Sequence, residues 1–211
     1  STKTANISIE KFAFTLAYKF NEALFSELTY NATDLKPFIN AVQVTDEEPR
    51  LTRAELNKVN LNYYVDDLIV NSVKDVGTYK ISPTYTSVNP NFKIKMPSSE
   101  FVFNVKPKTI KITIPQKEFV YRGEDIKSKI TYERSGIENS DLQNVSVEIS
   151  IPNHSEITNV GQYEGTVIIT GSSSNNYKPE IWEDGAPVGN EVKINVIPYD
   201  LSAIYSDMPS I

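Results

Sequence analysis

Apolar and polar residues alternate along much of the chain, which is the pattern of strands that bury one face. Between residues 58 and 66 apolar side chains recur at every second position, and this places Tyr63 and Tyr64 on opposite faces of one strand. The segment 144–152 alternates in the same way. The Gly-, Ser- and Asn-rich run at 171–176 predicts a loop between strands. The pattern therefore predicts a mainly β fold.

Two short segments favour helix instead. Thr52 and Glu55 have the spacing of a capping box, and Leu56 continues a helix-favouring run. Residues 22–27 form a second, weaker helical pattern. A helix packed on a sheet would make the first half of the chain β-grasp-like, so that fold stays open beside a β-sandwich with a short helical insertion.

A five-residue pattern occurs twice and indicates an internal repeat. Asp75-Val76-Gly77-Thr78-Tyr79 returns as Asn159-Val160-Gly161-Gln162-Tyr163, each time ahead of a run rich in Ile, Val, Thr and Tyr. This pattern is typical of a tyrosine corner. Gly77 or Gly161 permits the tight turn, and the phenol of Tyr79 or Tyr163 bonds to the backbone a few residues upstream. Two such corners predict two tandem Ig-like β-sandwich domains.

Further matches between the two halves keep the same order along the chain. They are Tyr18 with Tyr121, Leu28-Thr29-Tyr30 with Ile130-Thr131-Tyr132, Asn91-Phe92 with Asn176-Tyr177, and Phe103–Pro107 with Ile194–Pro198. We therefore expect a first repeat at 1–106, with an insertion at about 33–68, and a second repeat at 107–198. Residues 199–211 are then either a tail or the start of a truncated third repeat.

The second repeat resembles the MBG-type repeats of bacterial cell-surface proteins, which are Ig-like or β-grasp-like modules. The motifs that carry this resemblance are Tyr121-Arg122-Gly123-Glu124, Val160-Gly161-Gln162-Tyr163, Asn176-Tyr177 and Val196-Ile197-Pro198. The first repeat is a poorer match, because Tyr18-Lys19-Phe20-Asn21 lacks the glycine.

The resemblance implies a non-enzymatic module of an adhesin or surface stalk, located at the cell surface or secreted. Its partners would be host or microbial glycans, surface proteins, and adjacent repeats of the parent chain. A different class stays open, namely an accessory domain of a secreted polysaccharide-active enzyme, or a carboxylate-dependent hydrolase in its own right.

Composition excludes several other classes of function. Asp and Glu number 27 against 21 Lys and Arg, giving a formal net charge of −6, which argues against a nucleic-acid partner. The chain has no cysteine, so disulfides, zinc–thiolate sites and cysteine nucleophiles are impossible. No apolar stretch approaches the length of a membrane span, and no motif implies a cofactor.

Candidate catalytic chemistry is sparse. The single histidine, His154, lies in a turn-like segment, and no G-x-S-x-G elbow is present. Adjacent carboxylates such as Asp66 and Asp67 point to opposite faces of an extended chain, which suits glycosidase geometry poorly. With Asp75 they are weak candidates for calcium ligands, although no D-x-D-x-D-G loop exists. No catalytic residue is predicted.

Exposed aromatic side chains are the remaining candidates for binding. Trp182, expected in a loop beside Gly185, could offer its ring to a sugar or protein, or could cover the end of the sandwich core. One of Tyr63 and Tyr64 is expected to be exposed. A Lys–Asn isopeptide crosslink, which needs a buried lysine, also stays open.

Overall fold

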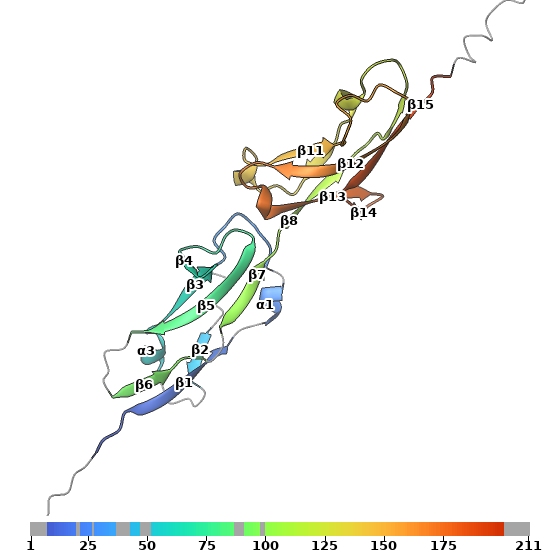
Figure 1. Ribbon diagram of the computed structural model, residues 1–211. Coiled ribbons are helices and arrows are strands. Elements are labelled where there is room, and N and C mark those ends of the chain that lie inside the picture. Colours follow the sequence, from blue (N-terminus) through green and yellow to red (C-terminus); the bar gives the residue numbers. More distant parts are fainter. Residues whose placement is uncertain are drawn as a thin grey trace, which may run out of the picture. The chain divides into compact units, whose positions relative to one another are not determined.

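A computed structural model describes residues 8–19, 22–26, 28–36, 43–46, 52–86, 91–97 and 100–200. The chain divides into two compact units, Ser1–Lys106 and Pro107–Ile211. Of the described residues 49% lie in strands, so the predicted mainly β class is confirmed (Figure 1). None of the helices in the described part is long and apolar enough to cross a membrane.

The described residues of the first unit form two sheets. One has the order β2-β1-β6, in which β1 pairs antiparallel with β2 and parallel with β6, and the other has the order β4-β3-β5-β7. The strands are β1 (Phe12–Lys19), β2 (Gln43–Asp46), β3 (Val59–Val65), β4 (Leu68–Val70), β5 (Gly77–Tyr85), β6 (Phe92–Lys95) and β7 (Phe101–Val105).

The second unit also contains two sheets, with orders β10-β8-β13-β14 and β11-β12-β15-β9. Its strands are β8 (Lys108–Thr113), β9 (Glu118–Val120), β10 (Glu133–Ser135), β11 (Ser146–Ser150), β12 (Gly161–Thr170), β13 (Tyr177–Glu183), β14 (Ala186–Gly189) and β15 (Glu191–Ile197). Short 3-10 turns are η1 (Lys127–Lys129), η2 (Asn139–Asp141) and η3 (Ser174–Asn176).

The core of the second unit lies between its two sheets. From the first sheet, Ile110, Ile112 and Ile181 are fully buried, and from the second sheet Val167 and Ile194 are buried as well. Strand β12 lies against β13, so the inner faces of the sheets are in contact. Apolar side chains at every second position supply this core, as in a β-sandwich.

Both predicted helices are present but very short. Helix α3 (Arg53–Leu56) begins with the amide of Leu56 donating to the carbonyl of Thr52 at 3.0 Å. Helix α1 (Glu22–Ser26) coincides with the weaker pattern, while Glu27 lies outside the described residues. Phe25 of α1 packs edge-on against Phe101 and Phe103 of β7, so this helix covers the end of one sheet.

Each unit forms the hydrogen bond expected of a tyrosine corner. The Tyr79 hydroxyl donates to the carbonyl of Asp75 at 2.8 Å, and the Tyr163 hydroxyl donates to the carbonyl of Asn159 at 2.8 Å. Burial, and secondarily the charge of Asp75, raises the pKa of Tyr79, which keeps this donor protonated. The bond fixes the turn before β5 and before β12.

A second hydrogen-bonded arrangement, which we call the aspartate clamp, also occurs in each unit. In the first unit one carboxylate oxygen of Asp34 accepts from the amides of Lys36 at 3.1 Å and Val73 at 2.9 Å. In the second, Asp125 accepts in the same way from Lys127 at 3.0 Å and Ile157 at 2.7 Å. Each clamp thus ties the turn at Lys36 or Lys127 to the residue two positions before the tyrosine corner, Val73 or Ile157.

Electrostatics fit this role for Asp125. The amide of Ile157, and then that of Lys127, holds the pKa of the Asp125 carboxyl below its usual range. The lysine of each clamp adds a further contact. The Lys36 ammonium donates to the carbonyls of Val70 and Asn71, and the Lys127 ammonium donates to those of His154 and Ser155.

Backbone hydrogen bonds correct the predicted alignment between the N-terminal parts of the two units. The amide of Tyr30 donates to the carbonyl of Lys106, after β7, and the amide of Tyr121 donates to that of Ile197, at the end of β15. Tyr30 therefore occupies the place of Tyr121, so the predicted match of Tyr18 with Tyr121 is wrong, and so is that of Leu28-Thr29-Tyr30 with Ile130-Thr131-Tyr132.

The corrected alignment changes two further expectations. Ala32 has φ of 60° where Gly123 has φ of 72°, so the first unit adopts the same left-handed turn without glycine. Residues 34–36 belong to the clamp that both units share, although the predicted insertion spans 33–68. The first unit also contains α1 before Tyr30 and the short strand β4 before Val73, whereas its β3 pairs with β5 as β11 pairs with β12 in the second unit.

One buried polar pair of the second unit has no counterpart of the same kind among the described residues of the first. The Tyr177 hydroxyl donates to the buried carboxylate of Asp141 at 2.7 Å and accepts from the amide of Glu138 at 3.1 Å. Burial, followed by the hydrogen bond to Asp141, raises the pKa of Tyr177 to about 12. The corresponding strand β6 begins with Phe92, which lacks a hydroxyl.

Candidate binding surface

Trp182 lies on strand β13, which corrects the expectation that it belongs to a loop. Strand β13 pairs parallel with β8 and antiparallel with β14, where Trp182 faces Pro187 across a register shift. The loop is confined to Asp184 and Gly185, whose φ values of 50° and 82° make a tight hairpin turn. Trp182 is therefore held by backbone hydrogen bonds on a sheet.

The outer face of this sheet supplies the surroundings of Trp182. Because Ile112 and Ile181 are buried and paired, Lys111, Thr113 and Trp182 next to them point to the opposite face. On β10, Ser135 pairs with Lys111 and Glu133 pairs with Thr113. Side chains from three adjacent strands thus meet around one indole ring.

These residues line a groove with a cavity volume of about 360 Å³. We call it the Trp182 groove, and its lining consists of Lys111, Thr113, Glu133, Arg134, Ser135, Trp182, Asp184 and Gly185. Two cationic and two anionic side chains are among them, so the charges of the wall balance. A volume of this size lies in the range of small-molecule sites, about 300–1,000 Å³.

The indole ring has an unusual contact on its face and an unsatisfied hydrogen-bond donor at its edge. The Lys111 ammonium lies 3.8 Å from the ring centroid, which is a cation–π contact. The indole N–H of Trp182 is buried and has no hydrogen-bond partner within the described part of the chain. A buried donor without an acceptor is uncommon in proteins, since it loses its bond to water and gains nothing in return.

Tyr63 and Tyr64 belong to the first unit and have different environments. Tyr63 is 5% exposed, and burial, then the charge of Asp34, raises its pKa. The Lys36 ammonium lies 5.0 Å from the Tyr63 ring centroid. Tyr63 is thus part of the core and offers no surface to a ligand, whereas Tyr64 is half-buried on the opposite face of β3.

The three aspartates considered for calcium are not assembled into a site. Asp66 and Asp67 form the β3–β4 turn, with φ of 48° and 63°, and Asp67 pairs with Lys80 at 2.9 Å. Hydrogen bonds from Lys80 to Asp67 and Glu100 raise the pKa of that lysine. Asp75 uses its backbone carbonyl for the tyrosine corner. Within the ranges that the structure describes, no group of three His, Cys, Asp or Glu residues is placed to hold a metal ion.

His154 is exposed, and its ring packs edge-on against Tyr163 with centroids 4.9 Å apart. Its backbone carbonyl accepts from Lys127 of the aspartate clamp. The histidine therefore covers the tyrosine corner. This is a structural role that needs no nucleophile nearby.

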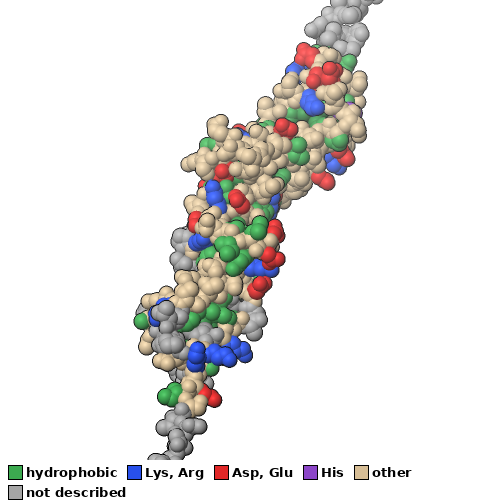
Figure 2. Space-filling model, turned by 60° about the vertical axis from the view of Figure 1, so that its left-hand side comes forward, with side chains coloured by type: hydrophobic (Ala, Val, Ile, Leu, Met, Phe, Trp, Pro, Cys, Tyr) green, Lys and Arg blue, Asp and Glu red, His purple; other side chains and the backbone are tan. Residues whose placement is uncertain are grey.

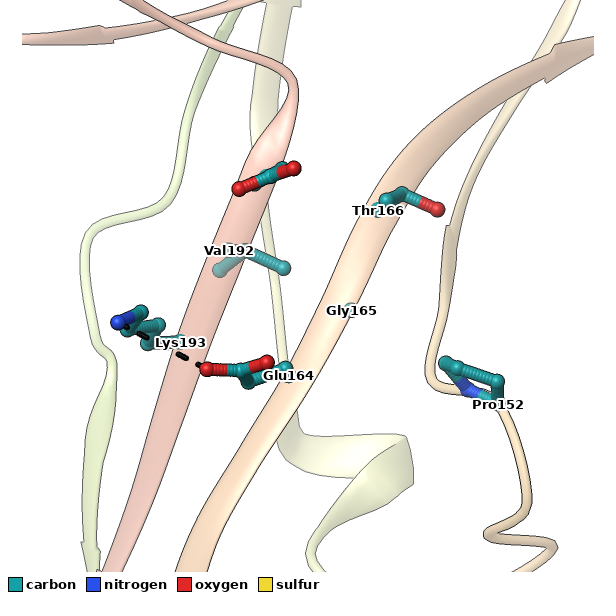
Figure 3. Close-up of a pocket in the computed structure, with 7 residues that line it drawn as sticks. Pro152, Glu164, Gly165, Thr166, Val192 and Lys193 are labelled. Atoms are coloured by element: carbon teal, nitrogen blue, oxygen red, sulfur yellow. Dashed lines mark ion pairs between the residues drawn. The ribbon is translucent and has the colours of Figure 1, made fainter.

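The described part of the second unit has further hollows, of which two are compared with the Trp182 groove. Figure 3 shows the smaller one, of about 170 Å³, which is lined by Gly165 of β12 together with Pro152 and the β15 residues Val192 and Lys193. Glu164 and Lys193 form an exposed ion pair at its rim, at 3.7 Å. It contains no aromatic side chain, so it has no platform for stacking.

The larger hollow, of about 580 Å³, is lined by Tyr121, Arg122, Val160, Pro198 and Tyr199. The Arg122 guanidinium lies 5.4 Å from the Tyr199 ring centroid. Its lining has two phenol rings and the Arg122 donors but no carboxylate. The Trp182 groove combines a ring with both cationic donors and carboxylate acceptors.

Sequence reasoning found Trp182 from its residue type and missed the residues around it. Lys111 and Glu133 come from β8 and β10, which are distant from Trp182 in the chain and meet it only through the sheet. The alternation in 108–113 does place Lys111 on an outer face, but the parallel pairing with β13 has no local signal.

Neither a protein family model nor a curated protein sequence matches this chain.

Proposed function

We propose that the chain is a pair of tandem Ig-like modules of the MBG type, forming a non-enzymatic segment of an exported bacterial surface protein. The segment acts as a stalk and presents an adhesive surface for glycans or proteins. The observation that carries this proposal is the recurrence of both the tyrosine corner and the aspartate clamp in each unit.

The strand pairing around the corners supports a common origin of the two units. In the first unit Gly77 pairs with Val105 and Tyr79 with Phe103, and in the second Gly161 pairs with Val196 and Tyr163 with Ile194. In both units the opening strand also pairs parallel with the strand that follows the long central one. Parallel pairing within otherwise antiparallel sheets is a specific feature, so its recurrence favours tandem repeats.

The aspartate clamp extends the resemblance to MBG-type repeats into the first unit. Tyr30-Asn31-Ala32-Thr33 takes the position of Tyr121-Arg122-Gly123-Glu124, and each is followed by Asp, an aliphatic residue and Lys. The poor match of the first repeat came from aligning Tyr18 in this place. With Tyr30 there, both units fit one pattern apart from the glycine and the acidic residue after it, which are Ala32 and Thr33 in the first unit.

The surface is in keeping with a segment that displays itself to solvent. Acidic and basic side chains are interspersed on the face drawn in Figure 2. Several charged side chains form ion pairs at the surface, as Lys80 does with Asp67 and Lys117 with Glu183. Surface charge of mixed sign supports solubility and does not favour a polyanionic partner.

Incubation of the chain with a panel of bacterial and host polysaccharides tests the non-enzymatic assignment. We expect no new reducing ends and no change in polymer size over a day, with or without added calcium. Depolymerising activity that persists after the chain has been purified to homogeneity would contradict the proposal and favour the hydrolase alternative.

A further inference from the structure

We propose that the Trp182 groove binds a neutral pyranose unit of a glycan, with the Lys111 side chain as a removable cover of the ring. This inference rests on the proposed function and deepens it, because it names the ligand class and the position of the adhesive surface. It is argued from the groove itself.

The indole ring of Trp182 is the platform on which the ligand would stack. The backbone of Trp182 is fixed by a parallel partner strand on one side and a tight hairpin on the other, which sets the position from which its ring projects. A fixed platform loses little conformational entropy when a ligand stacks on it. The C–H face of a pyranose is flat and weakly apolar, which suits a ring of this kind.

The Lys111 side chain is the cover of this ring. A cation–π contact at an exposed site is weak, and the Lys111 chain is long and flexible. A ligand that stacks on the indole therefore displaces the ammonium at small cost. The displaced ammonium remains a hydrogen-bond donor at the edge of the groove, where sugar hydroxyls can accept from it.

The unpaired indole N–H is a hydrogen-bond donor at the edge of the ring. It lacks an acceptor in the described structure, although it is buried. The N–H lies in the ring plane, so a ligand stacked on the face would accept from it through a hydroxyl that reaches past the ring edge. The bond satisfies a donor that is unsatisfied in the free protein, so it favours the bound state.

The charged side chains around the groove indicate the charge of the ligand. Lys111 and Arg134 balance Glu133 and Asp184 around the groove, and Ser135 and Thr113 add hydroxyls. A saccharide that carries a carboxylate or sulfate would meet the two carboxylates as well as the two cations. Balanced donors and acceptors suit a neutral polyhydroxylated ligand better.

The experiment exploits the fact that the chain has a single tryptophan. Fluorescence excited where tyrosine does not absorb reports on this groove alone. The full chain is titrated with neutral cello-, malto-, laminari-, xylo- and manno-oligosaccharides, and in parallel with oligosaccharides of hyaluronan and heparin. We expect at least one neutral series to change Trp182 fluorescence saturably and to give matching heat in calorimetry.

Variants then assign the contacts by calorimetry. Trp182→Ala is expected to weaken binding at least about tenfold, while Lys111→Ala leaves it unchanged or tightens it roughly two- to fivefold. Trp182→Phe retains a ring and measurable binding, which covers the case in which Trp182→Ala fails to fold. Tyr64→Ala, a half-buried tyrosine of the other unit, is the matched control and is expected to bind normally.

Three outcomes would overturn the inference. The first is no fluorescence change and no heat with any neutral series. The second is an affinity that Trp182→Ala leaves unchanged. The third is binding that is restricted to acidic saccharides and lost with Lys111→Ala. None of them affects the proposed non-enzymatic segment, which is tested separately by the absence of turnover.

Discussion

Replacement of Gly171 by alanine is expected to destabilise the second unit by about 3–5 kcal/mol. Gly171 has φ of 108°, and a Cβ atom added there would lie 2.2 Å from the carbonyl oxygen of Asn144. A side chain at this φ is strained even in open space. The contact is with backbone, so relief requires the segment before β11 to move.

Trp182 fluorescence during urea unfolding measures this effect, because the only tryptophan lies in the second unit. The matched control is Gly123→Ala, at φ of 72° with no atom within 4 Å of the added Cβ. It should cost only about 1–2 kcal/mol, and Ala32 already occupies the equivalent position of the first unit. Equal losses in the two variants would show that the Asn144 contact does not constrain the turn.

Truncation of Tyr163 to alanine is expected to cost the second unit about 3–5 kcal/mol, because it removes a buried ring together with the corner hydrogen bond. Tyr163→Phe keeps the ring and loses only the bond to the carbonyl of Asn159, so about 1 kcal/mol is expected. The urea midpoint detected by Trp182 fluorescence separates the two variants.

The equivalent change in the first unit provides the control. Tyr79→Ala removes the same ring and bond from the other corner, and it should leave the Trp182-detected transition in place. A lower midpoint of the Trp182-detected transition with Tyr79→Ala would mean that the two units do not unfold separately. No shift with Tyr163→Ala would mean that the corner contributes little to stability.

The features that sequence predicts well are those set by neighbouring residues. The strand at 59–65, the strand at 146–150 and both tyrosine corners depend on alternation or on five consecutive residues, and the structure has all of them. The helix at 53–56 follows from the capping-box spacing in the same way.

The alignment of the N-terminal parts failed for a physical reason. The match of Tyr18 with Tyr121 assumes one constant spacing between the two halves, but helix α1 lengthens the first unit before Tyr30. Tyr30 itself lacks the Tyr-x-Gly pattern of Tyr121. The backbone requires only a positive φ, which Ala32 adopts at 60°. The better signal was the aspartate, aliphatic residue and lysine at 34–36 and 125–127.

The candidate binding surface shows the complementary limit. A lone tryptophan beside a turn attracts notice by its residue type, but whether it lies in a loop or on a sheet depends on pairing with β8. That pairing is parallel and joins segments remote in sequence, so no local pattern encodes its register. Tyr63 and Tyr64 were correctly placed on opposite faces, yet only the packed structure shows that Tyr63 belongs to the core.

Unfolding of the two halves, residues 1–106 and 107–211, tests the central claim that the chain is a pair of self-sufficient modules. The account predicts that each half folds alone and unfolds cooperatively at the midpoint that it has in the full chain, by calorimetry and, for the second half, by Trp182 fluorescence. A half that is unfolded by itself, or a full chain with one transition that neither half reproduces, would contradict it.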